Sequence, residues 1–209
     1  FNKEDDNQKI TTKTAGIILE SIQGGAGFIE PKIDCLAKDK KRCEEVGALM
    51  IIDEIQPGFG RTGKLFGYEN YNVVPDVVII GKGMAGGMPV GGFIANEKYM
   101  DLLSHDPKLG HITTFGGHPV IAAASLATLK EILDKDYAAL SLKKEKLFRE
   151  LLVHPLIKEI RGKGLMLAAM TSDAEITNKV IFKCQDKGLI LFWLLFEPKA
   201  IRISPPLTI

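Results

Sequence analysis

The most constraining feature of this sequence is an apolar run that leads directly into two acids. In "ALMIIDEIQPGFGRTGK" (residues 48–64), residues 48–52 are apolar, and Asp53 and Glu54 follow them. Such a run is typical of a strand that is buried on both faces. A carboxylate at the end of a buried strand is costly unless a cation or a hydrogen-bond donor meets it. The sequence therefore predicts a buried strand and, for Asp53, a partner at its carboxyl end.

Apolar runs and helical patterns alternate along the chain, which indicates an α/β sheet with connecting helices. We expect strands at 15–20, 48–53, 75–83 and 89–96, and helices at 34–47, 118–135 and about 137–152. A smaller α+β unit begins near residue 136, with a strand in 157–170, a helix at 174–188 and strands at 189–196 and 200–204. This pattern predicts two domains, residues 1–135 and residues 136–209.

Composition narrows the class of protein. The 209 residues are 45% apolar with a net charge of +1, which gives no reason to expect nucleic acid or an anionic membrane as a partner. The most apolar run, residues 189–196, fits a buried strand better than a membrane span of about 20 residues. The three cysteines form no metal-ligand spacing and favour a reducing, cytoplasmic compartment. The chain lacks an initial Met and ends on "RISPPLTI", so we expect a fragment of a longer protein.

Three polar residues follow expected strands: Glu20, Asp53 and Lys82. Ligands of open α/β sheets bind outside the carboxyl ends of the strands, so parallel neighbours would point these residues into one crevice. Lys82 is flanked by glycines in "IIGKGMAGGMP", where a neutral amine could attack a carbonyl; the alternative is a solvated lysine. A pyridine-type cofactor would need a carboxylate such as Asp53, although a turn or cap role is the simpler interpretation.

"GFGRTGK" (residues 58–64) fits the glycine-rich phosphate loop of nucleotide-binding proteins. Leu65 follows where that motif needs Ser or Thr for Mg²⁺, and no helix pattern begins there. A P-loop protein is therefore kept only as an alternative, as is an inactive fragment.

Two further segments contain candidate anion-binding groups. "HITTFGGHP" places Thr113 and Thr114 before a helix, where they could bind a phosphate or only cap the turn. Arg202 alternates with apolar residues in "AIRISPP" and either faces solvent or clamps a carboxylate. No metal site and no Ser-His-Asp set is expected.

Five segments in order, "ESIQGGAGFIEP", "IIDEIQPGFGRTGK", "PDVVIIGKGMAGGMPVGGFIA", "TTFGGHP" and "IRISPPLTI", closely resemble the class III (subgroup II) pyridoxal-phosphate aminotransferases. That family includes the acetylornithine, ornithine and 4-aminobutyrate enzymes. The resemblance implies fold type I, with part of the large cofactor domain, a mixed and mostly parallel sheet, and part of the small C-terminal domain. It also implies a homodimer with shared active sites.

The resemblance assigns a role to each matching residue. Lys82 would bind pyridoxal 5'-phosphate covalently, and Asp53 would pair with the ring nitrogen. Ile55 would pack on the ring, Gln56 would bond its hydroxyl, and Glu20 would lie near the pocket. Thr114 would bind the phosphate in the neighbouring subunit, and Arg202 would hold a substrate carboxylate.

The implied reaction is a ping-pong, Schiff-base amino transfer from an ornithine- or acetylornithine-like donor to 2-oxoglutarate. A 4-aminobutyrate or other omega-amine transaminase is the nearest alternative. The sequence departs from the family at Gly25, where members often have Glu, and at His118, where Asn is usual. The upstream glycine-rich phosphate loop and ring-stacking aromatic have no counterpart, so the chain resembles about half of an enzyme.

Overall fold

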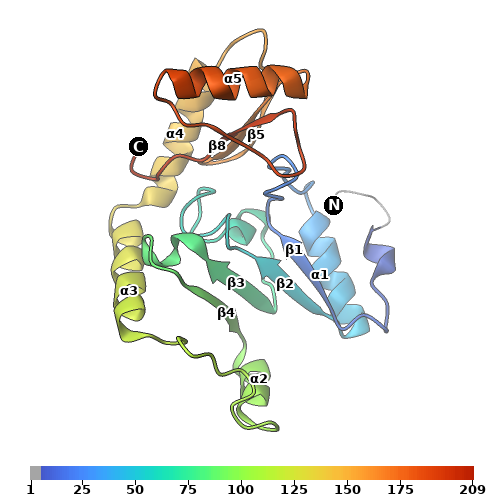
Figure 1. The fold of residues 1–209 in the computed structure, drawn as a ribbon. Coiled ribbons are helices and arrows are strands. Elements are labelled where there is room, and N and C mark those ends of the chain that lie inside the picture. Colours follow the sequence, from blue (N-terminus) through green and yellow to red (C-terminus); the bar gives the residue numbers. More distant parts are fainter. Residues whose placement is uncertain (1–5) are drawn as a thin grey trace.

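The computed structural model describes residues 6–209, apart from the side chain of Asp6, and contains two four-stranded sheets. Figure 1 shows the first sheet below, and the second sheet with its helix above. The α-helices are α1 (Cys35–Val46), α2 (Glu97–Met100), α3 (Pro119–Asp134), α4 (Tyr137–Leu151) and α5 (Ala174–Asp186). Short 3₁₀ helices are η1 (Asp6–Lys9), η2 (Gly67–Tyr71), η3 (Lys82–Ala85) and η4 (Asp101–Ser104).

The first sheet has the order β1-β2-β3-β4, formed by β1 (Gly16–Glu20), β2 (Leu49–Asp53), β3 (Val77–Gly81) and β4 (Gly91–Ala95). β1, β2 and β3 are parallel, and β4 is antiparallel to β3. This arrangement confirms the expected α/β class and its mixed, mostly parallel sheet.

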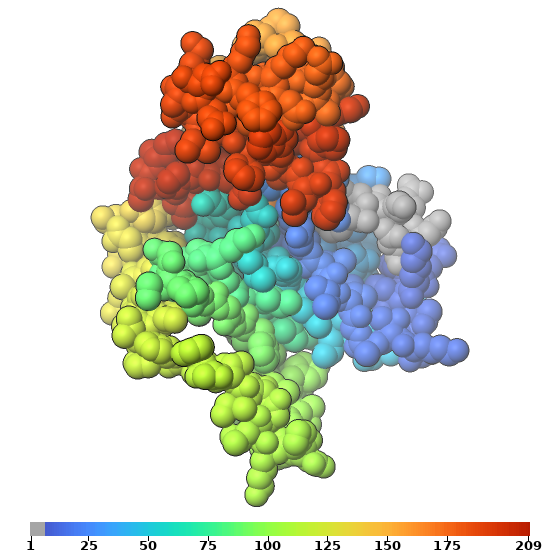
Figure 2. All heavy atoms as spheres, in the orientation of Figure 1, coloured from blue at the N-terminus to red at the C-terminus, as the bar shows by residue number. Residues whose placement is uncertain are grey.

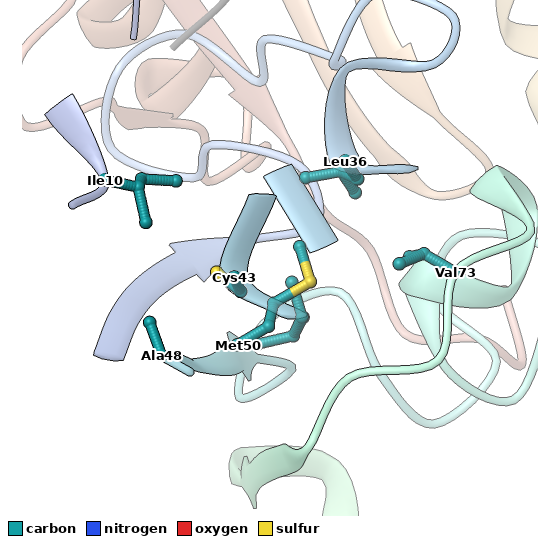
Figure 3. Packing of buried hydrophobic residues seen from close by; sticks show 7 residues of the cluster. Ile10, Leu36, Cys43, Ala48, Met50 and Val73 are labelled. Atoms are coloured by element: carbon teal, nitrogen blue, oxygen red, sulfur yellow. The ribbon is translucent and has the colours of Figure 1, made fainter. Parts of the chain in front are cut away.

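One face of the first sheet is packed. Met50 and Ile52 of β2 lie against Leu36 and Cys43 of α1, all of them buried. Figure 3 shows Leu36, Cys43 and Met50 gathered there with Ile10, Ala48 and Val73. On the same face, Val78 and Ile80 of β3 pack with Phe59 and with Ile132 of α3. Apolar residues at alternate strand positions thus bury this face in two core clusters, one against α1 and one against α3.

The opposite face of the first sheet is open. Ile18 of β1 is 67% exposed and Phe93 of β4 is 44% exposed, and between them lie the half-buried Ile51, Val77 and Ile79. In Figure 1 no helix crosses β2 and β3 in front. The prediction that strand 48–53 is buried on both faces is therefore wrong for this structure, because α1 covers one face only.

The second sheet has the order β5-β6-β8-β7 and is antiparallel, with β5 (Glu159–Lys163), β6 (Met166–Met170), β7 (Phe192–Trp193) and β8 (Ala200–Ile203). The single strand expected in 157–170 is two strands joined at Gly164. The turn needs glycine, because Gly164 has φ +60° and an added Cβ would collide with the carbonyl oxygen of Arg61.

The expectation of a buried strand at 189–196 is also wrong. Only Phe192 and Trp193 pair, at the edge of the sheet, and Ile190 is 81% exposed. Leu195 and Phe196 are exposed as well. Because these side chains flank a strand at the edge of the sheet, no other element within residues 6–209 packs over them, although they are apolar.

Figure 2 shows the segment around α2 projecting away from the rest of the molecule. Within residues 6–209, no helix is both long enough and apolar enough to cross a bilayer.

Candidate active site

The carboxyl ends of the three parallel strands lie side by side at one edge of the first sheet. Glu20 ends β1, Asp53 ends β2, and these two residues are register partners. Lys82 directly follows Gly81, the last residue of β3. The alternation of strands and helices predicted this shared edge, and register places Glu20 and Asp53 on the open face, with Ile18 and Ile51.

The two adjacent acids of "IIDEIQ" have different environments. The Asp53 carboxylate is half-buried and accepts a hydrogen bond from the backbone N–H of Ile55, with a separation of 2.9 Å. Glu54 points inward, is fully buried, and accepts from the N–H groups of Gly67 at 2.6 Å and Tyr68 at 2.9 Å. Burial raises the pKa of Glu54 above its ordinary value, although these hydrogen bonds act against the shift. Glu54 is thus a structural acid, whereas Asp53 remains available at the sheet edge.

Glu20 is held by its own loop. Its Oε2 accepts from the backbone N–H of Gly24 at 2.5 Å. A Cβ added at Gly24 would overlap the side-chain oxygen of Gln56, so any side chain there would displace Gln56. The 20–24 loop and Gln56 are therefore packed against each other beside Asp53.

Lys82 adopts a backbone conformation that is uncommon for a residue with a side chain. Its φ is +44°, in the left-handed region. Such strain costs about 1 kcal/mol or more and persists where the surrounding structure imposes it, often at functional sites. The side chain of Lys82 is exposed at the start of η3, which packs against α3. The local structure thus presents the amine at the end of β3.

A cavity of about 780 Å³ collects several of the predicted residues. Ile55, Gln56, Lys82 and Arg202 all line it. Ile55 also lies over Gly81, where an added Cβ would be 3.5 Å from its side chain. Glu20, Asp53 and Thr114 do not line this cavity. Asp53 lies next to the cavity, because its carboxylate accepts a hydrogen bond from the backbone N–H of the lining residue Ile55.

Arg202 reaches the cavity from the second sheet. It lies on β8 between Ala168 of β6 and Phe192 of β7 in register, and it is half-buried. Its Nε donates to the hydroxyl of Ser204 at 3.3 Å. The cavity is therefore bordered by both sheets, with an amine from one and a guanidinium from the other.

Arg61 also lines the cavity, and the sequence interpretation did not single it out. It lies in "GFGRTGK", the segment considered as a phosphate loop. That segment is followed by turns and then η2 rather than by an α-helix, so it lacks the helix N-terminus of a P-loop. Its Nη1 donates to the carbonyl of Leu165 at 3.2 Å and to that of Pro205 at 2.5 Å.

The remaining sequence candidates lie elsewhere. Thr114 is exposed, while its neighbour Thr113 lines a groove on the open sheet face. His118 precedes α3 and makes no side-chain capping hydrogen bond. The carbonyl of Gly25 accepts from the N–H of Phe196 at 2.9 Å. Among residues 6–209, no three His, Cys, Asp or Glu side chains gather as a metal site.

Comparison with known proteins identifies the family. The class III aminotransferase family model matches residues 3–209. Acetylornithine aminotransferase from Elizabethkingia anophelis is 32% identical with a TM-score of 0.89, and the match covers 100% of this chain and 54% of that one. Ornithine aminotransferase from Toxoplasma gondii is 31% identical with a TM-score of 0.86, covering 97% of this chain and 49% of that one.

Ornithine aminotransferase from Plasmodium yoelii is 32% identical with a TM-score of 0.85, and the match covers 99% of this chain and 57% of that one. The chain thus spans about half the length of these solved structures. Together with the match over nearly the whole chain, these likenesses confirm the resemblance drawn from its motifs: the chain belongs to the class III aminotransferases.

Proposed function

We propose that this chain supplies the reactive lysine and a substrate-binding arginine of a pyridoxal-phosphate-dependent aminotransferase. The donor would be an ornithine- or acetylornithine-like amine, and the acceptor 2-oxoglutarate. The observation that carries the proposal is the cavity that Lys82 and Arg202 line together, one from each sheet. The names of the similar structures, ornithine and acetylornithine aminotransferases, support the choice of donor.

The chemistry of the residues present fits pyridoxal phosphate. A primary amine, an apolar side chain and an amide line one cavity, from Lys82, Ile55 and Gln56 respectively. A half-buried carboxylate, Asp53, lies at the end of the adjacent strand with one of its oxygens bonded to the N–H of Ile55. A pyridine nitrogen needs such a carboxylate to stay protonated. The similar ornithine aminotransferase from Toxoplasma gondii has this cofactor at partial occupancy in its active site.

When bound, the cofactor supplies an aldehyde for attachment and a ring that accepts an electron pair from the substrate carbon. The residues of this chain would hold it and move protons. Lys82 would bind through Nζ and then carry a proton at that atom. Asp53 would stabilise the protonated ring nitrogen, and Gln56 would bond the ring hydroxyl. Ile55 would pack on the ring face and exclude water from it.

Arg202 would bind the substrate carboxylate, because a guanidinium donates two parallel hydrogen bonds that match it. Glu20, fixed by Gly24, would shape the pocket beside Asp53. We assign Thr114 to the phosphate of a second subunit. Its exposure and its position outside the Lys82 cavity are compatible with that role. The active form would then be a homodimer with shared sites.

We also propose that residues 1–135 belong to the large cofactor domain and residues 136–209 to the small domain. The presence of one sheet in each part supports this division. Within residues 6–209, Cys35, Cys43 and Cys184 form no disulfide, which supports a reducing, cytoplasmic compartment.

Covalent labelling tests the proposal. The purified protein is mixed with pyridoxal phosphate, reduced with borohydride and digested, and the pyridoxyl group is located by peptide mass spectrometry. We expect the label on Lys82 and a loss of it in Lys82→Ala. Lys64→Ala is the matched control, since Lys64 is also exposed but lies outside the cavity. Label spread over surface lysines, or absent altogether, would contradict the proposal.

A further inference from the structure

The cavity contains more positive than negative charge. Three cations line it, Arg61, Lys82 and Arg202. The acid among its lining residues is Glu131, whose Oε1 already bonds Lys135 at 2.9 Å and the hydroxyl of Tyr137 at 3.0 Å. The excess of positive charge favours an anionic ligand.

The arginines of this chain divide into two groups. Arg42 pairs with Glu45 at 3.1 Å, Arg149 with Glu145 at 2.9 Å, and Arg161 with Glu159 at 2.5 Å. Arg61 and Arg202 are the remaining two, and within residues 6–209 neither has a carboxylate within 4 Å. The two arginines without an acid are thus the two that line the cavity.

Arg61 is held in place by backbone atoms. The Arg61 Nη1 donates to the carbonyls of Leu165 and Pro205, and the backbone N–H of Leu165 donates to the carbonyl oxygen of Arg61 at 2.9 Å. These bonds fix the guanidinium against the segment that follows Arg202. Burial, and after it the like charge of Arg202, lowers the pKa of Arg61 below its ordinary value. Two guanidiniums that repel each other beside one cavity would be stabilised by an anion shared between them.

We propose that Arg61 is a second guanidinium of the substrate-carboxylate site, so that a carboxylate in this cavity is bound by Arg61 and Arg202 together. The proposal rests on the proposed function for the identity of the ligand, a carboxylic acid substrate. A purely structural arginine would resemble Arg149, whose guanidinium bonds the carbonyls of Ile160 and Gly162, both at 2.6 Å, and is neutralised by Glu145. Arg61 makes the same type of carbonyl bond without the acid.

The test measures binding of glutarate, an unreactive dicarboxylate, by calorimetry at low ionic strength and without added cofactor. We expect Arg61→Met to weaken glutarate affinity about tenfold or more, and Arg61→Lys to recover part of it, because the charge is kept but the two parallel hydrogen bonds are lost. Arg149→Met is the matched control. It should lower the thermal midpoint yet leave the affinity within about twofold of the parent.

A second measurement needs no variant. Phenylglyoxal modifies exposed arginines, and peptide mapping gives the rate at each one. Glutarate should slow modification of both Arg61 and Arg202 but not of Arg42. Protection of Arg202 alone, or wild-type affinity in Arg61→Met, would overturn the proposal. Because neither readout uses the cofactor, failure of Lys82 labelling leaves this test intact, and failure of this test leaves the labelling result intact.

Discussion

The two sheets differ in how completely this chain covers them. The second sheet has layers on both faces. Segment 22–28 contributes Ile22 and Phe28 to one side of β6, and α5 contributes Ile181 to the other. All five residues of β6 are buried. The first sheet has a packed face against α1 and a groove on the other, lined by apolar residues that include Ile18, Ile51, Val77, Ile79 and Phe93.

The better-covered sheet and the sheet that presents most of the candidate reactive residues are therefore different sheets. Sheets built from parallel strands are normally covered on both faces. The sheet that departs from this rule is the one whose carboxyl edge presents Glu20, Asp53 and Lys82. The second sheet, whose central strand β6 is covered on both faces, contributes Arg202 from the neighbouring strand β8. We therefore expect this chain to be stabilised chiefly by the second sheet, and its reactive groups to lie largely on the less supported one.

The largest effect should follow from a cavity in the covered sheet. Met166 is fully buried in one cluster with Phe28 and Ala200. Met166→Ala removes apolar contacts and leaves a void, so it should lower the free energy of unfolding by about 3 kcal/mol. Urea unfolding followed by circular dichroism measures this. Leu189→Ala, at a half-exposed position in the same part of the chain, is the control and should change little. Equal losses at both positions would mean that β6 is not the stable centre.

A smaller and pH-dependent effect is expected from Glu54, at the junction of the packed face and the site. Its pKa in the folded chain is raised, so between the unfolded and folded pKa values the folded chain holds a proton that the unfolded chain has lost. The contribution of Glu54 to the free energy of unfolding is therefore greatest at pH values below its pKa in the unfolded chain. It decreases as the pH rises through its pKa in the folded chain, by at most about 1.4 kcal/mol per pH unit.

Glu54→Gln removes that titration and should flatten the dependence of unfolding free energy on pH above about 4.5. Denaturant melts at a series of pH values give the slope. Glu69→Gln, an exposed side chain in the turn that Glu54 holds, is the control. A slope unchanged in Glu54→Gln would show that the buried carboxylate contributes no such proton.

Local sequence predicted most of the elements, because each was marked by its own residues. The strands at β1, β2 and β3 are apolar runs ended by an acid or a glycine, and Gly47 follows α1. The β5–β6 hairpin was missed because "RGKG" reverses the chain inside what otherwise resembles one strand. The exposure of Leu189, Ile190, Phe192, Leu195 and Phe196 could not be predicted, since it depends on the position of β7 at the edge of the sheet.

The part of the candidate site that follows directly from the strands was also predictable, and the part that depends on distant contacts was not. Glu20, Asp53 and Lys82 follow strands, so their common edge came from the order of elements. Arg61 could not be found in that way, because its hydrogen-bond partners, Leu165 and Pro205, lie more than 100 positions away. One local signal was available. Arg42, Arg149 and Arg161 each have a glutamate within four positions, whereas Arg61 and Arg202 have none.

The smallest change in the free energy of unfolding should come from a substitution on the open face of the first sheet. This substitution tests most directly whether that face is uncovered. Ile18 and Ile52 lie on adjacent strands of one sheet but on opposite faces, 67% exposed and fully buried respectively. Ile18→Thr keeps a β-branched side chain and should change the free energy of unfolding by less than about 0.5 kcal/mol. The same substitution at Ile52 buries a hydroxyl among apolar groups and should cost about 2 kcal/mol or more.

Urea melts of the two threonine variants at one protein concentration, and again at a tenfold higher one, supply the measurement. If Ile18→Thr costs as much as Ile52→Thr, the open face is covered in solution and the contrast between the sheets fails. A cost at Ile18 that increases with protein concentration would identify the cover as a second copy of the chain, because association contributes to stability in a concentration-dependent way. A small, concentration-independent cost would leave the face as the structure has it, apolar and open beside the residues that we expect to bind the cofactor.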